Sequence, residues 1–240
     1  MEKPTILIGV LRERFALWPF VDSLTYMCKH LDANGVKWAT VGVRTTNIYK
    51  GRERIADMMF DDKLEYTHLL FIDSDQTFVP ATALHLVNLD LDIVSGLVFQ
   101  RSPPHLPCIY RRVEGTDESL PLAIELAEWF EKYNVPAHGQ PVILDEPDDE
   151  SALMRVDETG TGCLMIRRHV FEALKKPFFT GNGPVGTDLM YARRCRAAGF
   201  DIWVDPRCQL GHITNYQVTA ADFRKTQKWR VADPNDLRDE

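Results

Sequence analysis

The feature that most constrains the fold is an unbroken apolar run, Leu-Leu-Phe-Ile at residues 69–72, which ends in Asp73-Ser74-Asp75. A strand that is apolar on both faces is typical of a parallel sheet covered by helices on both sides. Segments with strand spacing and segments with helical spacing alternate along the first hundred residues. This alternation predicts successive right-handed βαβ units, and therefore an α/β fold with a Rossmann-like, mostly parallel sheet flanked by helices.

Apolar spacing, together with Gly and Pro, sets the expected elements. The strands are predicted at residues 5–10, 36–43, 67–72, 92–98, 200–204 and 208–212, with a further apolar strand inside 156–167. The helices are predicted at residues 20–31, 52–60, 80–89, 120–133, 169–174 and 188–198. Asp205-Pro206, between the last two strands, is interpreted as a turn.

Asp73 and Asp75 follow a strand at the edge of the sheet where open α/β proteins bind their ligands. If the strand bends there, both carboxylates project into one pocket, and hard oxygen ligands suit Mg²⁺ or Mn²⁺. A metal that bridges two phosphates also stabilises the charge on a departing nucleotide diphosphate. The alternative is a capped turn, because Asp and Ser are common before helices.

The composition limits the other classes of function. The 28 basic and 35 acidic residues give a net charge of −7, which argues against a mainly electrostatic nucleic-acid binder. Five cysteines without a CxxC pair argue against a disulfide framework or a zinc knuckle. No apolar run approaches the roughly 20 residues of a membrane span, and the N-terminus lacks a signal-peptide layout. We therefore expect a cytoplasmic protein (in the host cytoplasm if it is phage-encoded) with no membrane partner.

Residues 71–80, around the Asp pair, resemble the Asp-x-Asp segment of GT-A-fold glycosyltransferases, especially those similar to family 2. Further segments follow in the family's order. Residues 159–168 resemble the glycine-containing strand that faces the donor sugar, and 186–194 the acidic motif that opens the acceptor-side helix. Residues 199–206, with Gly211-His212, resemble the closing segment, whose histidine often completes the metal site. The resemblance spans about residues 5–213, judged by motif order and spacing.

The resemblance implies a fold, a co-substrate and a metal. It implies a GT-A domain at residues 1–215, with a nucleotide-binding half (1–100), a proline-broken acceptor-side insertion or lid (101–158) and an acceptor and metal-completing half (159–215), followed by a tail at 216–240. It implies Mn²⁺ or Mg²⁺ held by Asp75, Asp73 and His212. It implies a nucleotide-diphospho sugar, with a UDP-sugar favoured, bound by Asp73, Ser74, Gly160, Thr161 and Gly162, with Arg44, Arg52 and Arg54 placed to pair with the diphosphate. Arg52 and Arg54 could equally lie on a solvated helix face.

Asp188 stands at the start of a predicted helix, after Gly186-Thr187. In inverting members of the family, the matching carboxylate is the general base that takes the proton from an acceptor hydroxyl. The family pattern has Glu-Asp where this chain has Thr187-Asp188, so one acid is missing. The alternative role for Asp188 is to favour the helix dipole, and both roles can hold at once.

The acceptor stays open among glycans, proteins, small molecules and hydroxymethylated DNA bases, which some phage enzymes of this fold glycosylate. Local basic residues in the insertion permit a DNA acceptor, and the net acidity counts against it; these residues are Arg101, His105, Arg111 and Arg112. A nucleotidyltransferase is an alternative enzyme class, but Leu11-Arg12-Glu13-Arg14 has no phosphate-loop glycines. A non-catalytic nucleotide-sugar-binding module is the third alternative. Nothing in the sequence indicates the oligomeric state.

Overall fold

The structure of the chain is a computed structural model. The structure describes residues 3–12, 16–61, 65–133, 152–181, 185–214 and 217–227. An acidic stretch at residues 145–150 and the last part of the expected C-terminal tail, residues 228–240, lie outside these described residues.

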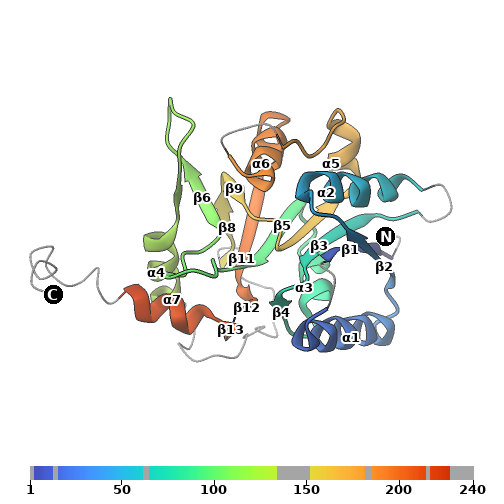
Figure 1. Ribbon diagram of the computed structural model, residues 1–240, viewed down its shortest axis with the longest axis horizontal. Helices are drawn as coiled ribbons and strands as arrows, with labels where there is room; N and C mark the ends of the chain where they lie inside the picture. The colour runs from blue at the N-terminus through green and yellow to red at the C-terminus, as the bar shows by residue number, and fades with distance from the viewer. Residues whose placement is uncertain are drawn as a thin grey trace, which may run out of the picture.

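A seven-stranded sheet runs through the middle of the protein in the order β2-β1-β3-β10-β5-β11-β8 (Figure 1). Its strands are β1 (Thr5–Arg12), β2 (Lys37–Arg44), β3 (His68–Asp73), β5 (Ile93–Leu97), β8 (Met154–Val156), β10 (Cys163–Arg167) and β11 (Ile202–Gln209). β10 runs antiparallel between β3 and β5, and β8 runs antiparallel to β11, while the other neighbours are parallel. This mixed, mostly parallel sheet confirms the predicted fold class.

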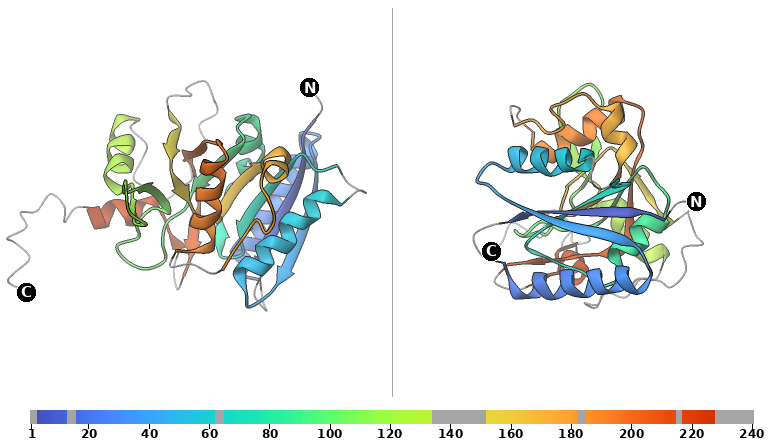
Figure 2. Two further views of the ribbon diagram at one scale, coloured as in Figure 1. Left: turned by 90° about the horizontal axis from the view of Figure 1, so that it is seen from above. Right: turned by 90° about the vertical axis from the view of Figure 1, so that its right-hand side faces the viewer.

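Helices cover both faces of the sheet (Figures 1 and 2). One face carries α2 (Ile48–Asp57) with the 3₁₀ turn η1 (Met58–Phe60), α5 (Arg168–Ala173) and α6 (Thr187–Ala197). The other face carries α1 (Trp18–Ala33) and α3 (Thr82–Asn88). The apolar run of β3 contributes to the core on both faces, as its unbroken pattern predicts: Leu69 and Phe71 face one cluster and Leu70 and Ile72 the other. Within the described ranges, no helix is both long and apolar enough to cross a bilayer.

Two small sheets complete the structure. β4 (Gln76–Thr77), β12 (Gly211–Ile213) and β13 (Gln217–Val218) form one of them in the order β13-β12-β4. β6 (Ile109–Arg112), β7 (Ser119–Pro121) and β9 (Glu158–Thr159) form the other in the order β7-β6-β9, next to α4 (Ala123–Lys132). The helix expected at 120–133 therefore starts later than predicted, because its first residues pair as β7.

The expected turn at Asp205-Pro206 is wrong, because both residues lie inside β11. The pairing of β11 with β5 shifts register between Asp205 and Gln209, and such an irregularity accommodates a proline without a ladder donor. Asp205 is fully buried and accepts hydrogen bonds from Arg207 Nε at 2.8 Å and His85 Nε2 at 2.7 Å. Burial alone would raise the pKa of Asp205, but these two partners hold it below its usual range.

The segment expected to be a tail from residue 216 is partly structured. Residues 220–227 form α7 (Ala220–Gln227), whose Phe223 is fully buried. The Phe223 ring centroid lies 5.3 Å from that of Phe99 and 6.3 Å from that of Phe130. The polar, charged sequence of this segment does not predict that α7 packs on the core, because in the described part of the helix a single aromatic side chain, Phe223, makes these ring contacts.

We expect Phe223→Ala to lower the free energy of unfolding by about 3–5 kcal/mol, because truncating a buried aromatic removes its transfer free energy and leaves a cavity. Leu120→Ala is the matched control: Leu120 is 59% exposed, so its truncation should cost under about 0.5 kcal/mol. Urea unfolding of the three proteins measures both values. A loss below about 1 kcal/mol for Phe223→Ala would show that α7 is not docked.

Candidate functional site

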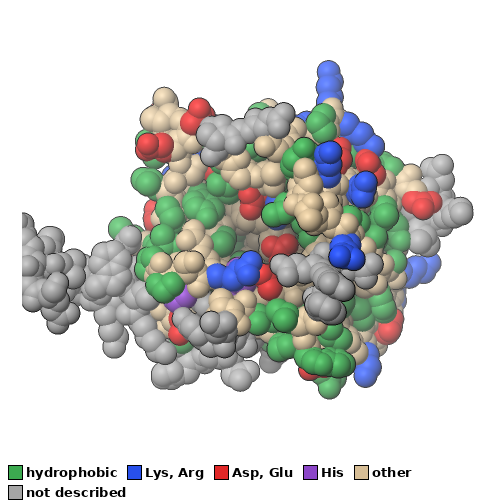
Figure 3. All heavy atoms as spheres, in the orientation of Figure 1, with side chains coloured by type: hydrophobic (Ala, Val, Ile, Leu, Met, Phe, Trp, Pro, Cys, Tyr) green, Lys and Arg blue, Asp and Glu red, His purple; other side chains and the backbone are tan. Residues whose placement is uncertain are grey.

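A cavity of about 780 Å³ lies beyond the carboxyl ends of β1, β2 and β3. It is lined by three arginines, Arg44, Arg52 and Arg101, and by the Asp73-Ser74-Asp75 segment. Figure 3 shows acidic side chains at the floor of a hollow in the middle of this face, with basic side chains at its edge near α2. The position is the one where open α/β sheets bind ligands.

Asp75 and His212 are brought together by backbone pairing between β4 and β12. Gln76, directly after Asp75, pairs with His212, and the Ile213 amide donates to the Asp75 carbonyl at 2.7 Å. The His212 Nε2 atom then lies 3.3 Å from Asp75 Oδ2. The Nδ1–H of His212 donates to the Phe99 carbonyl at 2.6 Å. This bond fixes the ring so that Nε2 is directed towards Asp75, and a hydrogen bond from the other ring nitrogen to a carbonyl is the second-shell arrangement that orients metal-binding histidines.

This pair fits a divalent cation. Two ligands on neighbouring corners of an octahedron with bonds of about 2.1 Å lie about 3 Å apart, close to the 3.3 Å between Asp75 Oδ2 and His212 Nε2. Among the described residues, no group of three His, Cys, Asp or Glu side chains could hold a metal by itself. Mg²⁺ and Mn²⁺ commonly take one or two protein ligands and fill the rest with water and substrate phosphate, so a pair is sufficient for a nucleotide-dependent site.

The two aspartates differ in their electrostatics. Burial raises the pKa of Asp73, and the neighbouring charges of Asp75 and Asp188 raise it further against the opposing Arg52. Burial also acts to raise the pKa of Asp75, but the hydrogen bond from His212 and the charges of His212 and Arg101 hold it below its usual range. Asp75 is thus the carboxylate kept charged, while Asp73 lies deeper, where negative charge accumulates.

Of the arginines expected to reach a diphosphate, two line the cavity and one does not. Arg52 is only 7% exposed, and its Nη1 donates to Thr187 Oγ1 at 2.8 Å. Arg44 is exposed at the end of β2. Arg54 is exposed and lines a neighbouring cavity instead, because residues two apart on a helix point to different sides. The structure therefore does not bring Arg54 into this site.

Gly160 and Gly162 lie against the acidic residues. The Gly162 carbonyl accepts the Asp73 amide at 3.1 Å, and a Cβ on Gly162 would lie 3.5 Å from Asp73 Oδ2. A Cβ on Gly160 would lie 3.7 Å from Asp188 Oδ2. Thr161, between the glycines, is buried, and its hydroxyl has no hydrogen-bond partner among the described residues. A longer chain in place of either glycine would fill the space beside these carboxylates.

Asp188 lies in the first turn of α6. Asp188 and Asp73 lie close to the same thiol, that of Cys108. Burial first, and then the charges of Asp188 and Asp73, raise the pKa of this thiol to about 12. Arg193, further along α6, pairs with the fully buried Glu158 of β9, just before the glycines. This ion pair joins the middle of α6 to β9, next to the glycine segment.

Two contacts at the cavity are not predicted by the sequence. Arg101, expected to belong to the basic acceptor side, instead places its Nη2 atom 3.0 Å from Asp75 Oδ2. Thr187, which stands where the family pattern has a glutamate, accepts a hydrogen bond from Arg52. The contact of Arg101 with Asp75 depends on how a loop folds back, and no sequence pattern predicts it. The hydroxyl of Thr187, directly before Asp188, could have been predicted as a hydrogen-bond partner at the site.

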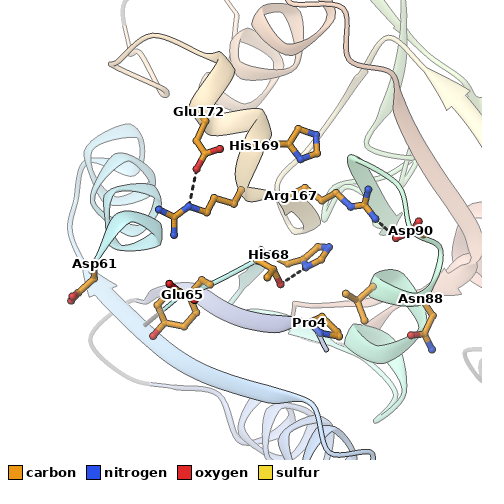
Figure 4. Close-up of a pocket in the computed structure, with 13 residues that line it drawn as sticks. Pro4, Asp61, Glu65, His68, Asn88, Asp90, Arg167, His169 and Glu172 are labelled. Atoms are coloured by element: carbon orange, nitrogen blue, oxygen red, sulfur yellow. Dashed lines mark hydrogen bonds and ion pairs between the residues drawn. The ribbon is translucent and has the colours of Figure 1, made fainter. Parts of the chain in front are cut away.

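A larger cavity of about 990 Å³ lies at the opposite end of β3 (Figure 4). Its arginines are already paired, Arg167 with Asp90 and Arg168 with Glu172, and His169 Nε2 lies 3.0 Å from Asp92 Oδ1. Because each positive charge has an acidic partner, this cavity does not concentrate the charge that a diphosphate needs. His68 lines it, with its Nδ1 atom 2.8 Å from Thr67 Oγ1.

The His68 ring gives a pH prediction. Burial, together with the charge of Arg167, lowers the pKa of His68 from 6.5 to about 4. Between these values the unfolded chain binds more protons than the folded protein, so stability falls as the pH falls from about 6.5 to about 4. We expect His68→Gln to flatten this loss by up to about 1.4 kcal/mol per pH unit, measured by urea unfolding at each pH. His30→Gln, in the last turn of α1, controls for removal of a histidine; equal slopes for wild type and His68→Gln would contradict the prediction.

No protein-family model matches this sequence, and no curated protein matches it significantly. Among solved structures, A197 from STIV superposes with a TM-score of 0.53 at 17% identity, over 88% of this chain and 86% of A197. GalNAc-T7, solved with UDP, GalNAc and Mn²⁺, superposes with a TM-score of 0.51 at 13% identity, over 90% of this chain and 43% of GalNAc-T7. The narrower resemblance to family 2 finds no support here and stays a prediction. At these identities the likeness concerns the fold, and the chain has the mixed, mostly parallel α/β architecture of the GT-A glycosyltransferases.

Proposed function

We propose that the protein is a metal-dependent glycosyltransferase that moves a sugar from a nucleotide-diphospho sugar, with a UDP-sugar favoured, to a hydroxyl group. One observation carries the proposal: Asp73, Asp75, Asp188 and His212, from distant parts of the chain, gather beside an arginine-lined cavity at the carboxyl ends of parallel strands. GalNAc-T7, which has a related fold, was solved with UDP, GalNAc and Mn²⁺, ligands of the kind proposed for this site.

The donor would bind with its diphosphate in the cavity. Arg52 is buried and fixed by Thr187, and Arg44 lies at the exposed side, so two guanidinium groups flank the space where phosphate oxygens would lie. Asp75 and His212 would hold Mn²⁺ or Mg²⁺, which supplies positive charge where the departing diphosphate becomes more negative. The glycine segment at 160–162 would leave room for the sugar beside Asp73 and Asp188.

Asp188 would act as the general base of an inverting transfer. Its carboxylate takes the proton from the acceptor hydroxyl, and the oxygen forms a bond to the anomeric carbon of the sugar. The bond from that carbon to the diphosphate breaks at the same time, and the nucleoside diphosphate leaves with the electron pair. Arg52 and Arg44 bind the leaving group and stabilise its added charge.

Donor binding is tested with Asp75→Ala. We expect wild-type protein to bind UDP more tightly with Mn²⁺ than without it, and the variant to lose this metal-dependent gain, about tenfold or more in Kd. Isothermal titration with UDP and with a panel of UDP-sugars, each with and without Mn²⁺, measures the effect. Glu128→Ala is the control, because it removes an exposed acidic side chain of α4 that does not line the cavity. If no nucleoside diphosphate binds the wild-type protein, the proposed function is wrong.

Asp188→Asn separates the base from the helix-capping role. We expect kcat to fall about 10²- to 10⁴-fold while UDP affinity stays unchanged, because the amide cannot accept the proton but keeps the shape of the side chain. Glu125→Gln removes an acid from the first turn of α4 and controls for the loss of a helix-dipole interaction. Full transfer by Asp188→Asn would refute the base assignment.

Product analysis distinguishes the alternative enzyme classes. A glycosyltransferase releases the nucleoside diphosphate, a nucleotidyltransferase releases pyrophosphate, and a binding module releases neither. Acceptors are screened as four classes with one labelled donor: glycans, protein hydroxyls, small molecules and duplexes that contain hydroxymethylated bases. Slow hydrolysis of the donor without any acceptor already identifies the sugar that fits.

A further inference from the structure

We propose that Arg101 is a mobile counter-ion of the metal site. In the metal-free protein it neutralises Asp75, and when metal and nucleotide bind it turns away from Asp75 onto the diphosphate. This inference rests on the proposed function, since it takes Asp75 and His212 as the cation-binding pair. It assigns Arg101 a positioning role for the metal and a binding role for the nucleotide.

The first argument is competition for one oxygen atom. Arg101 Nη2 lies 3.0 Å from Asp75 Oδ2, and His212 Nε2 lies 3.3 Å from the same oxygen. A divalent cation between Asp75 and His212 would need this oxygen and would repel the guanidinium beside it. Arg101 and the cation are therefore alternative partners of Asp75.

The second argument is that the side chain can move while its backbone stays in place. The Arg101 side chain is 58% exposed. The base of its loop is closed by a hydrogen bond from the Gln100 amide to the Leu106 carbonyl at 2.8 Å, and His105 Nδ1 lies 3.1 Å from the Gln100 carbonyl. A change of rotamer therefore suffices, and no loop movement is required.

The third argument is that the Arg101 side chain can reach the place where the diphosphate would bind. Arg101 lines the same cavity as Arg44 and Arg52, on the side of Asp75. Arg52 is buried and fixed by its bond to Thr187, so it cannot follow the ligand, whereas the exposed Arg101 can. A guanidinium group binds phosphate oxygens with two parallel hydrogen bonds, which makes the exchange favourable once the diphosphate arrives.

The size of the exchange is modest and measurable. An ion pair with an exposed partner changes an equilibrium constant by at most about fivefold, so Arg101 leaves Asp75 readily. The Arg101→Gln variant removes the charge and should have two effects of opposite sign. The affinity for Mn²⁺ alone should rise about two- to fivefold, because Asp75 has lost its competing cation. The affinity for UDP with Mn²⁺ should fall about tenfold, because a charged phosphate contact is lost.

In the first experiment, Mn²⁺ is titrated into protein without nucleotide, and electron paramagnetic resonance measures the free Mn²⁺. In the second experiment, UDP is titrated into the protein at saturating Mn²⁺, and calorimetry measures its binding. Arg111→Gln is the matched control: Arg111 is similarly exposed, at 51%, and pairs with Asp157 instead. It should change neither affinity. Arg101→Lys keeps the charge and should keep the wild-type Mn²⁺ affinity while weakening UDP binding.

The inference is overturned if Arg101→Gln leaves Mn²⁺ affinity unchanged or lowers it, if the variant binds no Mn²⁺ at millimolar concentration, or if its UDP affinity equals that of wild type. Failure of the proposed function is seen separately. In that case wild-type protein shows no metal-dependent UDP binding, or Asp75→Ala retains it. When wild type binds UDP with Mn²⁺ and Asp75→Ala does not, an unaffected Arg101→Gln refutes the role of Arg101 alone.

Discussion

The site depends on the pairing of two very short strands. β4 contains only Gln76–Thr77, yet its antiparallel pairing with β12 sets the distance between Asp75 and His212, 137 residues apart in sequence. Backbone hydrogen bonds fix this register, so the two side chains are held by the main chain and not by their own weak attraction. Phe99 then sets the ring orientation of His212 through its carbonyl. The closeness of Asp75 and His212, on which the proposed cation pair rests, follows from this pairing.

The antiparallel strand β10 provides the second constraint. It runs between β3 and β5, so the chain enters it at the edge where Asp73 ends β3. This direction brings the glycine segment beside Asp73, where a βαβ crossover would have brought a strand in from the other end. The buried pair of Arg193 and Glu158 then ties α6, and with it Asp188, to the same edge. The mixed direction of the sheet therefore brings Asp73 and the glycine segment to the edge where Asp188 lies.

Much of the first half of the fold follows from local signals. The spacing of apolar residues and the positions of Gly and Pro predict β1, β2, β3, β5 and the helices between them, because each element buries one continuous apolar pattern against a neighbour. These local patterns do not predict the structure where contacts with residues distant in sequence determine it. The sequence predicts a turn at Asp205, but the residue lies in a strand, since Arg207 and His85 satisfy its buried carboxylate with hydrogen bonds. Phe223 reads as part of a tail but is buried against Phe99, and Arg101 meets Asp75 only because its loop folds back. The position of the Asp pair at a strand end could be predicted, whereas its partners needed the resemblance or the structure.

The order in which the site is assembled during synthesis follows from the late position of β12. A ribosome releases the strands and helices of the first hundred residues, with Arg44, Arg52 and both aspartates, long before His212 leaves the exit tunnel. A nascent or shortened chain of that length therefore contains the arginines of the cavity without the histidine of the cation pair. Such a chain has arginines of the cavity but lacks half of the pair proposed to hold the metal. The proposed cation pair can therefore form only after β12, near the end of the described chain, has been synthesised.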